Sequence, residues 1–298
     1  MVDVWTTTEP PSNDVALGTD RRWRAAPADV LLAITFGAIA LAWWPLVVAL
    51  QGPRPIQFMP LLAHVCGMAA GYGVLVLLAL MSRAPALERG VGADVLTRWH
   101  AAGGRMGVGL VVVHAWAATV AWSESRREGL ALAGWHVIGL PGLAVTTAGT
   151  LLLLGVAVAS ARSARHRLSF EAWHAIHLLT YVSVAMTFLH QLAGPDLAGR
   201  RPLQLAWALL YANVFALLVR HRVIAPLRQA SRHRLRVVSV VPETPGVVSI
   251  EMAGEHLDEL RAEPGQFLRW RFLTQTTGCR PTPSRCRPHR LINDSGSR

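Results

Sequence analysis

Six stretches of the chain contain no Asp, Glu, Lys or Arg, and short segments, several of them rich in arginine, separate them. A helix that crosses a bilayer needs about 20 predominantly apolar residues, with about 17 as the lower end. The uncharged stretches reach this length, so the pattern predicts six transmembrane helices. We expect these helices near residues 30–50, 60–82, 100–122, 142–161, 171–193 and 202–220.

The composition supports this reading. Of the 298 residues, 52% are hydrophobic and 16% are charged, and the mean hydropathy is +0.34. A soluble domain usually carries about 25% charged residues. We therefore expect a multi-pass membrane protein that contacts lipid.

The net charge of +11 arises from 29 arginines with no lysine. Fifteen arginines lie at one end of the predicted helices, in residues 21–24, 83–98, 162–167 and 220–236, and five lie in loops at the other end. Positive residues favour the cytoplasmic side of a membrane. Both termini are therefore expected in the cytoplasm, with the protein in the plasma membrane, and the basic charge needs no nucleic-acid partner.

Four histidines lie inside the predicted helices: His100 and His114 in the third, and His177 and His190 in the fifth. Ionisable groups are costly in hydrocarbon and usually mark a functional site. The fourteen positions from His100 to His114 correspond to about four helical turns and about 21 Å of rise along the helix axis. The thirteen positions from His177 to His190 correspond to about 19.5 Å. Because both helices run in the same direction, His100 is expected opposite His177, and His114 opposite His190.

Two facing imidazoles can hold a haem iron from both sides, which favours electron transfer over oxygen binding at the iron. The four histidines are therefore candidate ligands of two haems, one near each membrane surface. Arg98 and Arg105 bracket His100 and are candidate partners of the haem propionates, although a role as cytoplasmic flanking charges explains them equally well.

The fifth helix leaves alternatives open. Thirteen residues place His177 and His190 about 140° apart around an ideal helix. The helix must tilt, bulge or present its ligands from different flanks, and His174 is an alternative inner ligand. Cys66 and His64 are interpreted as structural. The remaining histidines are interpreted as solvated residues of loops or tails: His136, His166, His221, His233, His256 and His289.

Beyond the sixth helix the pattern changes to short β-branched runs. Residues 235–241 and 247–252 predict two strands around a turn, and residues 263–272 predict a third, which are too few to close a barrel. Residues 275–298 show no period and are expected to be disordered. The expected architecture is an all-α membrane bundle followed by an incomplete antiparallel β-barrel fragment. Its parts are a polar cytoplasmic tail (1–26), the six-helix bundle (27–222), the partial β domain (223–274) and the tail (275–298).

Three segments, 83–89, 94–114 and 170–190, resemble the ferric reductase-like transmembrane family, which includes NADPH oxidases and bacterial relatives. The resemblance covers about residues 27–272. It maps the family's ligands for two b-type haems onto His100, His114, His177 and His190. It also implies FAD and NAD(P)H domains on the cytoplasmic side.

Residues 237–272 are similar to the opening of that family's flavin-binding barrel. The family's Arg/His-Pro-Tyr/Phe-Ser-type flavin motif should follow Phe272, but residues 275–298 stand there instead and are typical of an altered reading frame. The nicotinamide domain is not found in the chain.

The expected function is a transmembrane oxidoreductase that passes electrons from the cytoplasmic side through two bis-histidine haems to an acceptor such as ferric iron or oxygen. One alternative is a haem membrane subunit fed by a separate flavoprotein or by quinol. Others are a truncated, non-functional reductase and a transporter with a histidine proton relay. The transporter should show repeated or broken helices, and no clear repeat is found.

Overall fold

The computed structural model describes residues 25–53, 55–161, 166–260, 267–272 and 280–285, the last two ranges by their backbone course alone. The chain divides into two compact units, Met1–Val219 and Arg220–Arg298. The first unit is helical and contains the candidate site. Each unit is described by itself below.

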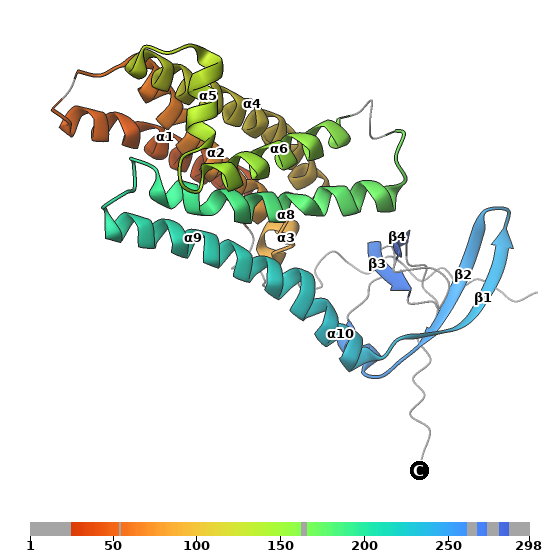
Figure 1. Ribbon diagram of the computed structural model, residues 1–298. Helices are drawn as coiled ribbons and strands as arrows, with labels where there is room; N and C mark the ends of the chain where they lie inside the picture. Colours follow the sequence, from red (N-terminus) through yellow and green to blue (C-terminus); the bar gives the residue numbers. More distant parts are fainter. Residues whose placement is uncertain (1–24, 54, 162–165, 261–266, 273–279, 286–298) are drawn as a thin grey trace, which may run out of the picture. The chain divides into compact units, whose positions relative to one another are not determined.

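Six long helices make up the first unit (Figure 1). All six are long and apolar enough to cross a membrane. They confirm the six predicted spans and the all-α membrane class. Their bounds are α1 (Pro27–Gln51), α2 (Phe58–Leu80), α4 (Ala93–Arg126), α6 (Leu143–Ser160), α8 (Phe170–Ala193) and α9 (Arg201–Val219).

Two short helices, α3 (Pro85–Val91) and α5 (Leu130–Ile138), were not predicted because neither is long enough to show a clear period. The expectation of a loop at His136 was wrong, since this residue lies on α5. Its side chain is exposed, as expected, and its Nδ1 lies 2.9 Å from a carboxylate oxygen of Glu128.

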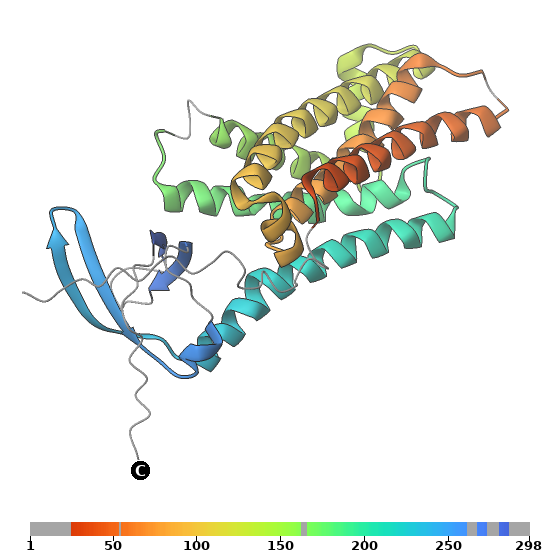
Figure 2. The same ribbon diagram turned by 180° about the vertical axis from the view of Figure 1, so that it is seen from behind.

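The helices pack in two close pairs, α2 with α4 and α6 with α8, while α1 and α9 lie against α2 (Figure 2). Small residues permit the close approach, as is usual between membrane helices. The buried Ser183 hydroxyl donates to the Gly149 carbonyl at 2.7 Å, between α8 and α6. A Cβ at position 149 would lie 2.8 Å from Met186 Cβ, so this crossing requires glycine.

Large apolar side chains on the outside of the bundle remain exposed, as lipid-facing residues do. Phe36 is 76% exposed, and Leu189 is 73% exposed. The buried residues instead gather in two clusters. One joins α2, α8 and α9 around Met68, Leu75 and Val184, and the other joins α2, α3 and α4 around Leu80, Val91 and Leu96. Cys66 is a buried free thiol on α2, which agrees with its interpretation as a packed residue.

A polar network holds α2, α8 and α9 together inside the first cluster. The buried Tyr211 hydroxyl contacts the Gly71 carbonyl oxygen at 3.1 Å and Gln191 Oε1 at 2.9 Å. The Trp207 indole N–H donates to the same Gln191 oxygen at 3.1 Å. Because hydrocarbon offers no other partner, these bonds satisfy groups that would otherwise be costly to bury.

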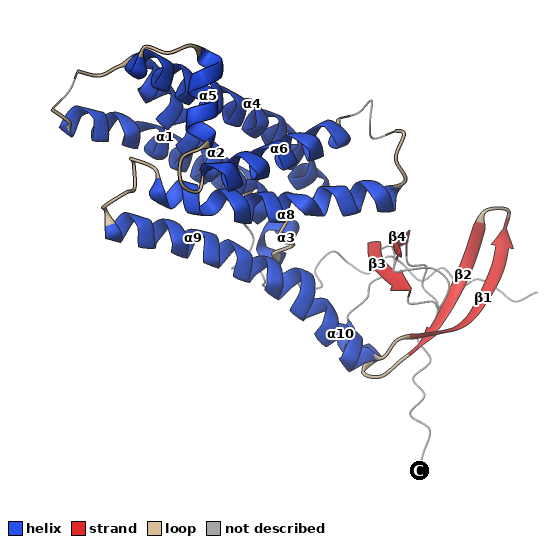
Figure 3. Ribbon diagram, viewed as in Figure 1, coloured by secondary structure: helices blue, strands red, loops and turns tan. Residues whose placement is uncertain are grey.

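The second unit begins with a π-helical turn, Arg220–Ile224, and α10 (Ala225–His233). Two strands, β1 (Arg236–Thr244) and β2 (Val247–Ala253), then form an antiparallel hairpin (Figure 3). They confirm the two predicted strands and the turn between them, in which Gly246 has a φ of +81°. β3 (Phe267–Phe272) confirms the third predicted strand.

The prediction of disorder over residues 275–298 was wrong for β4 (Arg280–Arg285), which pairs antiparallel with β3; the rest of that range lies outside the described residues. Pro281 and Pro283 alternate along β4, so both missing N–H groups point to the same side of the strand. An edge strand tolerates that arrangement. The described strands form two separate two-stranded sheets and not a closed barrel.

The expectation that His233 is solvated was also wrong, because this residue is buried. Its carbonyl accepts a hydrogen bond from the Glu255 N–H at 2.8 Å, and Leu257 is buried in the same unit.

On the surface of the second unit, the Arg232 guanidinium makes two hydrogen bonds with the Glu259 carboxylate. The bond from this guanidinium holds the pKa of Glu259 below its usual value.

The network around Gln191 leads to a stability prediction. Tyr211→Phe leaves the Gly71 carbonyl and the Gln191 amide oxygen each with one partner fewer, and should destabilise the bundle by about 1–3 kcal/mol. Thermal unfolding in detergent measures the change. Tyr181→Phe is the matched control, because Tyr181 contacts Phe215 only through its ring. Equal midpoints for the two variants would show that the network contributes nothing.

Candidate metal centre

Two pairs of histidines face one another between α4 and α8. The ring centres of His100 and His177 lie 6.0 Å apart, with their planes at 73°. The ring centres of His114 and His190 also lie 6.0 Å apart, with their planes at 54°. The pairing expected from the sequence is therefore confirmed. We call His100–His177 the inner pair and His114–His190 the outer pair, after the expected topology.

The facing imidazoles come from α4 and α8, two helices whose backbones do not pack closely against each other. Within the described residues, the closely packed helix pairs include α2 with α4 and α6 with α8, whereas α4 and α8 do not form such a pair. The four rings are half-buried. The histidines thus project from two separate helix pairs into the space between them.

The spacing of each pair suits a metal ion between the rings. A metal–imidazole bond of about 2 Å on each side, plus about 1 Å from each ring nitrogen to its ring centre, gives a separation of about 6 Å. Among the described residues, no group of three or more His, Cys, Asp or Glu side chains could hold an ion. Two protein ligands leave the remaining positions of the metal to another donor, and the four nitrogens of a porphyrin supply that number. The residues present therefore fit a haem better than a free ion.

A backbone carbonyl of α2 orients the outer histidine on α4. His114 Nδ1 lies 2.7 Å from the Ala63 carbonyl oxygen. An imidazole that donates from Nδ1 carries its proton there, so Nε2 holds the lone pair that binds a metal. The Ala63 carbonyl is reachable because residue 67, four positions further along the helix, is glycine. A Cβ on Gly67 would lie only 2.8 Å from His114 Nδ1.

The inner pair is oriented from both sides. His100 Nδ1 lies 3.2 Å from the Leu77 carbonyl oxygen near the end of α2. His177 Nδ1 lies 3.4 Å from the hydroxyl of Ser160, the last residue of α6. The Trp173 indole donates to the same hydroxyl at 3.3 Å and stacks on the His177 ring, with centres 5.1 Å apart. Each helix that carries the histidines is thus supported by the helix packed against it.

The structure resolves the alternatives that the spacing left open on α8. This helix is continuous from Phe170 to Ala193, so no bulge corrects the register. The helix presents its two histidines from different flanks instead. His177, and not His174, lies opposite His100; the exposed His174 stacks on Phe170, with ring centres 5.8 Å apart.

Glycines line the face of α4 that carries its histidines. Gly104 and Gly107 follow His100 by four and seven residues, so they lie on the same helical face. A Cβ at either position would have no heavy atom within 4 Å. The side of α4 that carries His100 and His114 therefore leaves room for a flat group next to the helix.

The expected arginine partners lie elsewhere on α4. On an ideal helix Arg98 and Arg105 are about 160° and about 140° around from His100. Both side chains are exposed. Their position suits flanking charges at a membrane surface, and a contact with haem propionates stays a prediction.

Sequence reasoning missed the groups that orient the rings. The Ala63 and Leu77 carbonyls give no signal in a sequence, because every residue carries a carbonyl. Gly67 does give a signal, as part of a run of small residues in α2, but the run does not tell which of its glycines faces a histidine.

Six helices that are long and apolar enough to span a membrane, with two histidine pairs between α4 and α8, define a multi-pass membrane protein. Residues 66–188 match the family model of the ferric reductase-like transmembrane component, and this part of the chain belongs to that family. The matched segment contains His100, His114 and His177, and His190 lies just beyond its end. No curated protein matches the chain.

The contact at Gly67 leads to a sharp prediction. Gly67→Ala should push His114 off the Ala63 carbonyl and away from His190, and should lower the haem-to-protein ratio of the purified protein by about half. Gly73→Ala is the matched control on the same helix, because a Cβ there meets nothing within 4 Å. Alanine is the better helix former at both positions. Full haem content in Gly67→Ala would contradict the described geometry.

Proposed function

We propose that this chain is a transmembrane oxidoreductase that carries electrons from the cytoplasmic side of the plasma membrane, through two b-type haems, to an acceptor on the other side. The membrane-embedded oxidoreductase class follows from the ferric reductase-like domain. The observation that supports the haems is the pair of 6.0 Å imidazole contacts between α4 and α8, which lie at two different levels along these helices.

Some residues of the chain would hold the haem irons, and others orient the imidazole rings that hold them. His100 with His177, and His114 with His190, would hold one haem iron each from both sides. The Ala63 and Leu77 carbonyls keep the proton on Nδ1 of His114 and His100, so Nε2 would be the nitrogen that holds the iron. Bound haem would supply a one-electron carrier whose iron has no open position for oxygen.

The apolar helix bundle would provide the path along which electrons cross between the aqueous phases on the two sides of the membrane. Fourteen residues of α4 separate His100 from His114, which corresponds to about 21 Å of rise. Apart from the exposed Arg105, the residues between the two histidines are apolar or small, and they would limit the entry of water and ions. The excess of arginine at the inner end supports cytoplasmic termini.

The donor on the inner side is a flavoprotein that uses FAD and NAD(P)H. The β hairpin of the second unit supports a relationship to a flavin domain, yet the described strands form two open sheets. This openness favours the alternative in which a separate flavoprotein supplies the electrons. Ferric iron or oxygen is the acceptor that the family suggests.

Reduced-minus-oxidised absorption spectra of the purified protein test this proposal. The wild type should show a b-type signal and about two haems per chain. His100→Leu and His114→Leu should each remove one haem and leave the other. His174→Leu is the matched control and should retain both, because the exposed His174 stacks on Phe170 while His177 lies opposite His100. A protein without a b-type signal, or one unchanged in His114→Leu, would disprove the proposal.

A further inference from the structure

A second imidazole site lies outside the two histidine pairs. His64, on α2, has its Nδ1 3.1 Å from Asp196 Oδ1, in the turn that follows α8. The carboxylate side chain is 9% exposed and the imidazole 30% exposed. A carboxylate buried at the edge of a membrane bundle is costly unless it is paired. The ion pair therefore fixes the His64 ring with Nδ1 toward Asp196.

Several other bonds hold the turn that carries Asp196. The Trp44 indole donates to the Asp196 carbonyl oxygen at 3.0 Å. Arg200 donates to the Pro195 carbonyl oxygen at 3.2 Å, and its guanidinium lies over the Trp44 ring. Contacts with Trp44 of α1 and with Arg200 thus fix the position of Asp196. The Asp196 carboxylate then orients the His64 imidazole. A carboxylate that orients an imidazole is the usual support of a histidine that transfers protons.

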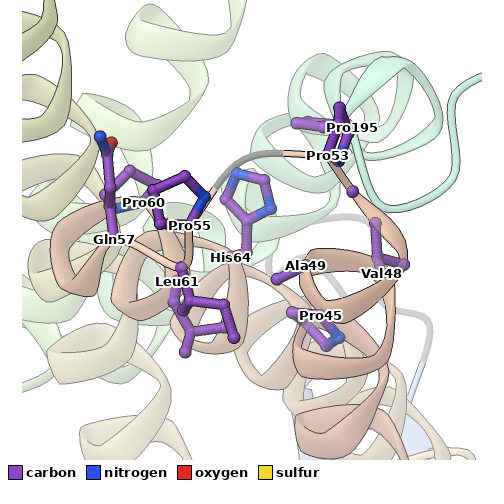
Figure 4. Close-up of a pocket in the computed structure, with 12 residues that line it drawn as sticks. Pro45, Val48, Ala49, Pro53, Pro55, Gln57, Pro60, Leu61, His64 and Pro195 are labelled. Atoms are coloured by element: carbon purple, nitrogen blue, oxygen red, sulfur yellow. The ribbon is translucent and has the colours of Figure 1, made fainter.

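The imidazole rises into an apolar pocket at this end of the bundle (Figure 4). The pocket has a volume of about 500 Å³ and is formed by the end of α1, the start of α2 and Pro195. Most of its lining is proline and aliphatic, and among the lining residues that the structure describes His64 is the titratable one. A cavity of about 300–1,000 Å³ with few convergent polar groups is typical of a small-molecule site.

This pocket is connected to the outer histidine pair through adjacent residues. Ala63, whose carbonyl orients His114, is the residue before His64. Asp196 follows His190 by six residues on the same segment of chain. Electrons that reach the outer pair would therefore arrive close to a group that can deliver protons.

We propose that the pocket binds a quinone-class molecule and that His64 delivers protons to it, an inference that rests on the proposed function. An uncharged ring with two carbonyl groups matches an apolar lining whose hydrogen-bonding side chains, among the described residues, are the His64 imidazole and the Gln57 amide. Two electrons, taken one at a time from the haem that the outer pair would hold, and two protons would convert the two C=O groups of the quinone into hydroxyl groups. His64 gives each proton from Nε2 to a carbonyl oxygen and regains one from external water, while Asp196 holds the ring through Nδ1.

Two measurements on the full-length protein in detergent test this site. Equilibrium dialysis measures retention of a short-chain benzoquinone, and stopped-flow absorption measures how fast that quinone reoxidises the reduced protein. Ala49→Phe fills the pocket and should abolish retention. His64→Gln should keep retention within about twofold but slow reoxidation about 100-fold, the scale of general acid catalysis. Added imidazole should partly restore the rate, which a purely structural role would not allow.

His136→Gln is the matched control, because His136 also pairs with a carboxylate, Glu128, but does not line the pocket. It should behave as the wild type in both measurements. Equal quinone retention in Ala49→Phe and the wild type, or an unchanged rate in His64→Gln, would overturn the proposal even in a protein with two haems. Dialysis does not depend on haem, so an absent haem signal would defeat the proposed function without deciding whether the pocket binds quinone.

Discussion

The structure depends on one constraint of the membrane interior, where a polar side chain must find its partner within the protein. The four histidines satisfy this constraint across two helix pairs. α2 offers backbone oxygens to the histidines of α4, and α6 offers the Ser160 hydroxyl to His177 on α8. The rings then meet between α4 and α8, where the backbones stand apart. Without these supports the imidazoles would be free to rotate, and the distance between facing rings would not be defined.

The two pairs are supported by different means. The outer pair relies on a carbonyl in the middle of a helix, which only a glycine four residues later leaves accessible. The inner pair relies on groups near helix ends and on the stacked Trp173 ring. The contact of His114 with Gly67 and the Ala63 carbonyl involves backbone atoms that cannot rotate. The Ser160 hydroxyl and the Trp173 indole are polar side chains that polarise and shield the His177 imidazole. The two sites are therefore expected to differ in environment although their ring separations are equal.

Most of the fold was predictable from the sequence, because a run of uncharged residues long enough to span a bilayer has few other solutions. The pairing of the four histidines was predictable for a related reason: thirteen and fourteen residues of helix place two side chains at opposite depths. The errors fell where local signals are weak. β4 is rich in proline and arginine and was expected to be disordered, and His233 is buried where its backbone carbonyl bonds to Glu255, which is distant in sequence.

The sequence by itself determined which segments enter the membrane, which helices carry the four histidines and at what depths, because hydropathy and helical rise are local properties. Only the tertiary structure decided how closely the paired rings approach across the gap, that His177 rather than His174 lies opposite His100, and that Ala63, Leu77 and Ser160 orient the rings. It also brought Asp196 to His64 across 132 positions of chain. Those outcomes depend on how helices far apart in sequence pack, and side-chain spacing along one helix carries no information about its neighbour.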